Sequence, residues 1–119
     1  MNASEFNSYM NSLEAGASLQ NVRDIFGLPL AHIPASVFKV KPGSEMRELG
    51  LNFSFPVEAA TEYLVYRHPT RRRMLRILGF RDGFLCGGAQ QTYTSAAEGF
   101  MLRQIQSWRE QSLSPLIEE

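Results

Sequence analysis

The sequence has a single cysteine, no excess of charge of either sign and no long hydrophobic run. Because Cys86 is the only cysteine, no intrachain disulfide can form. The cysteine count therefore does not distinguish a reducing from an oxidising cellular compartment. Twelve basic and twelve acidic side chains cancel, which argues against DNA or RNA as the main partner. No apolar stretch approaches the ~20 residues that would cross a bilayer.

An export signal is also missing from the first residues. Residues 1–15 contain no basic side chain and no apolar core, so they are not expected to direct export. Two localisations stay open: the cytoplasm, or the cell envelope or periplasm if an export signal has been removed. With 119 residues and 44% hydrophobic side chains, residues 1–119 are predicted to fold as one domain with its own core.

The most informative stretch is 16–29, which predicts a short helix followed by a sharp turn. Ser18 is a good N-cap because its hydroxyl accepts a first-turn N–H. Gly27 can adopt the left-handed conformation that ends a helix. Between these two residues an apolar stripe recurs at three- and four-residue spacing, formed by Leu19, Val22, Ile25 and Phe26.

A similar stripe precedes this helix. Phe6, Tyr9, Met10 and Leu13 recur at helical spacing, which predicts a first helix from Ser4 to Ala15. Residues 4–29 are therefore predicted to form a helical hairpin.

Residues 30–61 are predicted to be an irregular insertion, because proline and glycine interrupt them repeatedly. Within the insertion we expect two short strands, at 37–40 and 51–55. Residues 44–49 are predicted to form one helical turn.

Residues 62–90 predict a three-stranded antiparallel meander. The first two strands are rich in aromatic and β-branched side chains, which strands prefer. The pair Asp82-Gly83 is the signal of a tight hairpin between the second and third strands. The third strand is expected to end at Gly87-Gly88.

Residues 95–112 predict a C-terminal helix. Ser95 and Glu98 have the spacing of a capping box, and an apolar stripe follows, formed by Met101, Leu102, Ile105 and Trp108. We expect this stripe to pack on the apolar face of the sheet; if the first two helices cover that face, the last helix is free for dimerisation. The predicted fold class is α+β: a two-helix hairpin packed on a three- or four-stranded antiparallel meander, plus a C-terminal helix.

Two residue patterns carry a family resemblance. The first has six defined places, Gly-x-Ser-x-x-x-Val-x-x-x-Phe-Gly-x-Pro, occupied by Gly16, Ser18, Val22, Phe26, Gly27 and Pro29. The second is Phe-x-x-Gly-x-Leu, occupied by Phe80, Gly83 and Leu85. Both resemble the small envelope-lipoprotein domain called SmpA/OmlA or BamE, which is related to the β-lactamase inhibitor protein domain. The resemblance implies a helix–helix–sheet domain used for protein contacts, commonly in the cell envelope.

The most distinctive charge feature is a run of arginines, since half of the twelve basic residues lie between positions 67 and 81. Alternation along a strand predicts that Arg72 and Arg76 share an outward face with Met74. The simplest interpretation is a solvated sheet face paired with carboxylates. The functional interpretation is a docking surface for an acidic partner or for lipid phosphates, formed by Arg67, Arg71, Arg72, Arg73 and Arg76.

Few residues are candidates for catalysis or metal binding. His32 and His68 have no other ligand at a recognised metal-site spacing, and both are expected to be structural or solvent-exposed. Cys86 is expected to be a half-buried strand cysteine and not a nucleophile. No catalytic residue, metal site or cofactor is therefore predicted.

The predicted function is a non-enzymatic protein-interaction module of the BamE type. Its partner is a protein, such as an envelope assembly complex, bound through the sheet face or the 30–61 insertion. The oligomeric state stays open, and a homodimer is one of the forms left open. Nucleic acid is not expected as a partner, and membrane contact only if the native chain is lipidated.

Two alternatives stay open. One is a small ligand-binding or enzymatic domain with a pocket between sheet and insertion that uses His32, Cys86 or Tyr63. The other is a cytosolic regulatory or nucleic-acid-associated protein that uses the arginine-rich strand.

Overall fold

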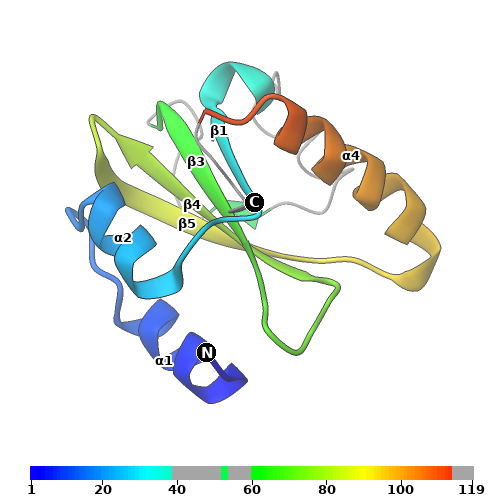
Figure 1. Ribbon diagram of the computed structural model, residues 1–119, viewed down its shortest axis with the longest axis horizontal. Coiled ribbons are helices and arrows are strands. Elements are labelled where there is room, and N and C mark those ends of the chain that lie inside the picture. The colour runs from blue at the N-terminus through cyan, green and yellow to red at the C-terminus, as the bar shows by residue number, and fades with distance from the viewer. Residues whose placement is uncertain (39–51, 54–59, 114–119) are drawn as a thin grey trace.

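A five-stranded antiparallel sheet lies between two helical layers (Figure 1). The computed structural model describes residues 1–38, 52–53 and 60–113. The sheet order is β1-β3-β4-β5-β2, with α1 and α2 on one face and α4 on the other. The helices are α1 (Ala3–Ser12), α2 (Leu19–Phe26) and α4 (Glu98–Glu110), with 3-10 turns η1 (Ala35–Phe38) and η3 (Ser95–Ala97). The strands are β1 (Ala31–Pro34), β2 (Asn52–Phe53), β3 (Glu62–Arg67), β4 (Met74–Arg81) and β5 (Phe84–Thr92). The predicted α+β class is confirmed.

The helical hairpin forms as its local sequence predicts. The Ser18 hydroxyl accepts the N–H of Asn21 at 3.1 Å, and Gly27 closes α2 with a φ of +80°. The first helix is shorter than predicted. It ends at Ser12 and not at Ala15, because Leu13 takes an extended conformation with a ψ of 135°.

The link between α1 and α2 is hydrogen-bonded to the β4–β5 hairpin. The N–H of Gly16 donates to the Leu85 carbonyl at 2.8 Å, and the N–H of Leu19 donates to the Gly83 carbonyl at 2.8 Å. Asp82 and Gly83 both have positive φ, at 54° and 84°, as a tight hairpin requires. The two patterns singled out in the sequence therefore meet in space.

The meander β3–β4–β5 is confirmed, but its third strand runs past Gly87-Gly88 to Thr92. A β-bulge makes Cys86 an extra residue, since Phe80 pairs with Leu85 whereas Gly79 pairs with Gly87. The strand therefore does not end at Gly87-Gly88, contrary to the expectation. A Cβ on Gly88 would lie 3.1 Å from Leu78 Cδ2, so the glycine allows close packing against this side chain.

The insertion contains a strand that the sequence did not reveal. Ala31–Pro34 forms β1 and pairs with β3, whereas the predicted strand at 37–40 is wrong for residues 37 and 38, which belong to η1. β2 lies within the predicted strand 51–55 and pairs with β5. The helical turn predicted at 44–49 lies outside the described residues.

The free edge of β1 is covered by the segment that follows α4. The N–H of Leu113 donates to the His32 carbonyl at 2.6 Å, and the Ser112 hydroxyl donates to the same carbonyl at 3.1 Å. The N–H of His32 in turn donates to Ser112 Oγ at 3.0 Å. This outer strand is therefore hydrogen-bonded on both sides.

The C-terminal helix begins differently from the prediction. The capping box of Ser95 and Glu98 is wrong: the Thr94 hydroxyl accepts the N–H of Ala97 and starts η3, and α4 starts only at Glu98. Glu98 is engaged elsewhere, by two arginines. Leu102 is exposed, whereas the other three residues of the predicted stripe are buried.

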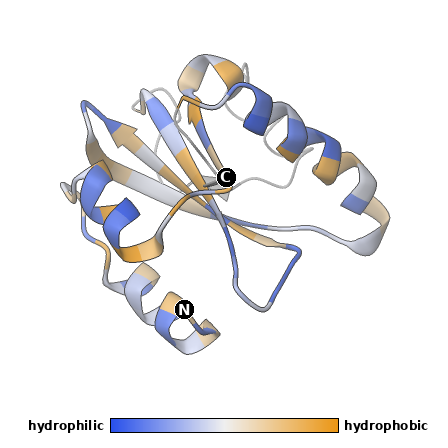
Figure 2. Ribbon diagram, viewed as in Figure 1, coloured by the Kyte–Doolittle hydropathy of each residue, from blue (hydrophilic) through white to orange (hydrophobic). Residues whose placement is uncertain are grey.

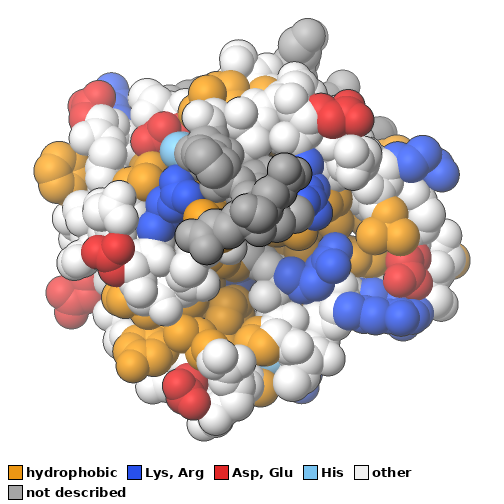
Figure 3. All heavy atoms as spheres, viewed as in Figure 1, with side chains coloured by type: hydrophobic (Ala, Val, Ile, Leu, Met, Phe, Trp, Pro, Cys, Tyr) orange, Lys and Arg blue, Asp and Glu red, His pale blue; other side chains and the backbone are white. Residues whose placement is uncertain are grey.

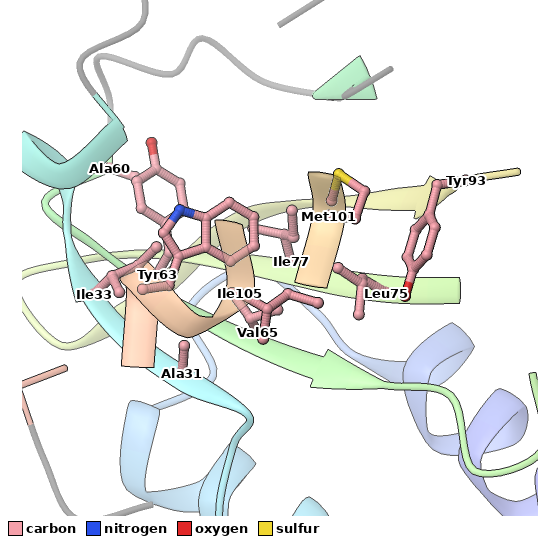
Figure 4. Packing of buried hydrophobic residues seen from close by; sticks show 11 residues of the cluster. Ala31, Ile33, Ala60, Tyr63, Val65, Leu75, Ile77, Tyr93, Met101 and Ile105 are labelled. Atoms are coloured by element: carbon pink, nitrogen blue, oxygen red, sulfur yellow. The ribbon is translucent and has the colours of Figure 1, made fainter. Parts of the chain in front are cut away.

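Each face of the sheet has its own hydrophobic cluster. On the α4 face, Trp108 is 2% exposed and packs with Met101 and Ile105 against strand residues such as Val65 and Ile77 (Figure 4). This confirms that the last helix covers the sheet. On the other face, the cluster comprises Phe6, Met10, Val22, Leu64, Tyr66, Leu78, Phe80 and Leu85. Figure 2 shows hydrophobic segments in strands and helices alike, and hydrophilic residues along the β3–β4 hairpin.

Among the described residues, no helix is both long enough and apolar enough to cross a membrane.

Candidate functional site: an arginine pocket

The predicted arginines do not share one strand face. β4 begins at Met74, so residues 71–73 lie in the turn before it and strand alternation does not apply to them. Arg76 does alternate with Met74 and Leu78, but that face is covered by α1 and α2. The expectation of an outward, solvated face bearing Arg76 is therefore wrong.

Arg72 and Arg73 share one carboxylate, that of Glu98. Arg73 Nη2 lies 3.2 Å from Glu98 Oε2, and Arg72 Nε lies 3.7 Å from Glu98 Oε1. These two ion pairs connect the β3–β4 hairpin to the first turn of α4. A carboxylate at this end of a helix also interacts favourably with the helix dipole. These two residues fit the interpretation of a solvated, paired surface.

Arg71 and Arg76 come together at a different place. Both line a hollow of about 270 Å³ between α1, the β3–β4 hairpin and β5, which we call the arginine pocket. The polar side chains that line it are Asn7, Asn11, His68, Arg71, Arg76 and Gln90. Among the residues that the structure describes, no carboxylate forms an ion pair with either arginine.

The Arg76 guanidinium is partly buried, and not all of its hydrogen-bond donors have a partner within the described part of the chain. Its Nη1 donates to Gln90 Oε1 at 3.2 Å, while its Nε is buried with no hydrogen-bond partner among the described residues. Desolvation lowers the pKa of this guanidinium, because burial disfavours the charged form. Arg76 also lines a second hollow of about 200 Å³ next to Met10 and Gly88. A buried donor without a partner is costly, so this guanidinium contributes less to stability than a fully bonded one would.

His68 fixes the backbone that carries Arg71. Its Nδ1 accepts the N–H groups of Thr70 and Arg71 at 3.2 and 3.1 Å, so that nitrogen carries no proton. Nε2 therefore carries the proton and donates to Asn7 Oδ1 at 3.2 Å. Burial, followed by the charge of Arg71, lowers the pKa of His68. The residue is structural, as expected, and it joins the hairpin to α1.

The remaining chemical candidates are structurally occupied. His32 is buried and its Nε2 lies 3.2 Å from Glu62 Oε2. Cys86 is half-buried and donates to the Gly79 carbonyl at 3.4 Å, and burial raises the pKa of its thiol. In the described part of the chain, no cluster of three His, Cys, Asp or Glu side chains is placed to hold a metal ion.

Arg67 belongs to another site. It lines a hollow of about 390 Å³ at one corner of the sheet, together with Arg109 from the last turn of α4. Figure 3 shows hydrophobic side chains gathered over α1 on the visible face, with basic side chains mostly elsewhere on it. The five predicted arginines are thus divided among a paired surface, the arginine pocket and this corner.

Sequence reasoning missed the polar partners of the arginines. Asn7 and Asn11 are four residues apart on α1 and flank Met10, so their spacing places both on one side of the helix. That i, i+4 pair beside an apolar stripe was the available signal. No sequence pattern pointed to Gln90, because its place opposite Arg76 depends on the register between β4 and β5.

Comparison of the chain with protein-family models, with characterised proteins and with solved structures finds no match.

Proposed function

We propose that this chain is a non-enzymatic protein-interaction module that binds an acidic segment of a protein partner in the arginine pocket. The observation that carries the proposal is the pair Arg71 and Arg76, which line one hollow and form no ion pair with a described carboxylate. Guanidinium groups bind carboxylates through two parallel hydrogen bonds, and such bonds strengthen where water is excluded.

The setting of the pocket favours recognition over catalysis. His68, the nearest titratable base, is held neutral with both ring nitrogens bonded. The other polar groups of the lining are amides and guanidiniums, which do not transfer protons near neutral pH, and the rest of the lining is apolar. These groups suit a bound carboxylate and supply no nucleophile.

A protein partner is favoured over nucleic acid by the charge distribution. Arg72 and Arg73 are paired with Glu98, and the chain as a whole has no net charge. Phosphate-tracking surfaces require an extended positive stripe, which this pairing interrupts. The resemblance to BamE-type domains supports the same class of function and extends the proposal to a partner in the cell envelope.

The test is titration of the chain with fluorescein-labelled hexaglutamate at about 150 mM salt, where long-range attraction is screened. We expect saturable binding that weakens at least about tenfold in Arg71→Gln and in Arg76→Gln, since each removes a charge-assisted bond. Arg81→Gln is the matched control, because Arg81 is exposed and lines none of the three hollows. Circular dichroism verifies that each variant folds.

Two outcomes would overturn the proposal. An equal loss of affinity in Arg81→Gln would show diffuse charge attraction and no pocket. Tighter binding of a twelve-residue oligothymidine would favour the nucleic-acid alternative, with Arg72→Gln then expected to weaken it as well.

A further inference from the structure

The corner hollow lies where both helical layers meet the same edge of the sheet. β1 begins and β3 ends there, since Ala31 pairs with Val65 and the N–H of Leu30 donates to the Val65 carbonyl at 2.7 Å. The α2–β1 link and the start of α1 contribute from one layer, and Arg109 contributes from the last turn of α4. We call this hollow the corner pocket.

Its wall is aromatic and fixed in place. The ring of Phe26 lies 5.6 Å from that of Phe6 and 5.5 Å from that of Tyr66. The Tyr66 hydroxyl donates to the Gly27 carbonyl at 3.0 Å, which ties this wall to the end of α2. Leu28, in the lining, is 42% exposed, so an apolar surface remains open to solvent.

Its charged lining is basic only. Arg67 and Arg109 both line the corner pocket, and no described carboxylate pairs with either of them. A ligand that fits this lining has an apolar body and one anionic group. The volume of about 390 Å³ is near the lower end of the range for small-molecule sites.

We propose that the corner pocket binds a small amphipathic carboxylate, with its apolar body against Phe26, Leu28 and Tyr66 and its carboxylate at Arg67 and Arg109. This site is distinct from the arginine pocket and goes beyond the proposed function. The two hollows share only Phe6 in their linings, and their arginines differ. Aromatic and aliphatic groups supply the burial of the body, and the guanidiniums select the charge.

The probe is octanoate, titrated calorimetrically into the full chain, with octan-1-ol and octylammonium as matched neutral and cationic analogues. We expect octanoate to bind saturably and at least about tenfold more tightly than octan-1-ol, because a charge-assisted bond distinguishes them. Octylammonium is expected to bind more weakly than either. Amide chemical shifts should move in the residues around Leu28 and Arg67.

Variants separate the site from general hydrophobic binding. Arg67→Gln combined with Arg109→Gln should remove the preference for octanoate over octan-1-ol. Arg103→Gln, an exposed position on α4 outside all three hollows, should leave that preference unchanged. Leu28→Trp, at a half-exposed position, should fill the pocket and weaken octanoate and octan-1-ol alike.

Three results would overturn the inference: no saturable binding of octanoate, equal affinity for octanoate and octan-1-ol, or shifts centred on Arg76. Octanoate that displaced hexaglutamate would also overturn it, because the two ligands would then share the arginine pocket. Loss of hexaglutamate binding with octanoate binding intact would contradict only the proposed function.

Discussion

The two faces of the sheet are packed in different ways. On the α4 face the indole of Trp108 is almost completely buried in a continuous cluster, and at the start of α4 Glu98 pairs with Arg72 and Arg73. On the α1–α2 face two hollows flank Arg76, whose Nε has no hydrogen-bond partner among the described residues. The centre of the α4 face is filled, whereas the α1–α2 face leaves volume open beside a partly buried charge. The arginine pocket therefore lies on the less completely packed face, the corner pocket lies where the two layers meet, and the filled cluster under α4 supplies stability.

The largest expected effect tests that division directly. Trp108→Ala should lower the free energy of unfolding by about 3–5 kcal/mol, because it empties the α4 core. Phe6→Ala should cost roughly half as much, since α1 is anchored by only two buried side chains and can open while the sheet stays folded. Urea unfolding gives both energies, and amide hydrogen exchange shows which strands lose protection. Equal losses with global exchange in both variants would contradict the division.

Acid should weaken the α1–α2 face through His68. Its pKa is lowered in the folded chain, so the unfolded chain binds the proton first as the pH falls. The stability is complete above the unfolded pKa of about 6.5 and declines below it, with a slope of up to about 1.4 kcal/mol per pH unit. Urea midpoints measured at about pH 8 and about pH 5 give this slope.

The control is His68→Gln, which cannot take up a proton. Its midpoint should fall less between the two pH values than that of the unsubstituted chain, whatever its stability at neutral pH. Identical slopes in the two proteins would rule out His68 as the source of the pH dependence.

Arg76→Met should stabilise the chain while it abolishes acidic-peptide binding. The variant removes a partly desolvated charge and a buried Nε without a partner, and we expect a gain of about 1 kcal/mol in unfolding free energy. Arg81→Met, at an exposed position, should change stability by less than about 0.5 kcal/mol. A loss of stability in Arg76→Met would mean that the guanidinium is a structural element and not a binding one.

The smallest effect is expected for Glu98→Gln. This substitution removes the carboxylate that pairs with Arg72 and Arg73, so both faces of the sheet would then carry arginines without an ion pair among the described residues. Loss of this partly exposed pairing should cost about 1 kcal/mol or less, because ion pairs near the surface contribute little. With Arg72 and Arg73 released, hexaglutamate should bind more tightly, by about twofold to threefold. Unchanged affinity in fluorescence titration would show that the released arginines do not reach the arginine pocket.

Local chemistry determined which parts of the fold could be predicted. Ser18, Gly27 and the Asp82-Gly83 turn act within a few residues of themselves, and each does what its residue type favours. The predicted capping box does not form because the Glu98 carboxylate pairs with Arg73 and Arg72, which lie 25 and 26 positions earlier in the chain. β1 escaped notice because proline lies at its end and the strand it pairs with, β3, is about thirty residues further along the chain.

The sequence identified the arginines of the candidate site but not which of them lie together in the fold. Arg71 and Arg76 were named from composition, yet their separation from Arg72 and Arg73 depends on β4 starting at Met74. The role of His68 depends on a contact with Asn7, sixty-one positions earlier in the chain. The corner pocket combines residues from both ends of the chain, which no local pattern indicates.

The hydrogen bonds of Ser112 and Leu113 to His32 have a consequence for how copies of this chain behave beside one another. An unpaired outer strand is a template on which a second chain can extend the sheet, and such growth leads to aggregation. Here Ser112 and Leu113, directly after α4, take up the outward-facing N–H and carbonyl of His32. The helix that completes the core thus also positions the segment that blocks this part of the sheet edge, so loosening α4 would expose a strand edge together with Trp108.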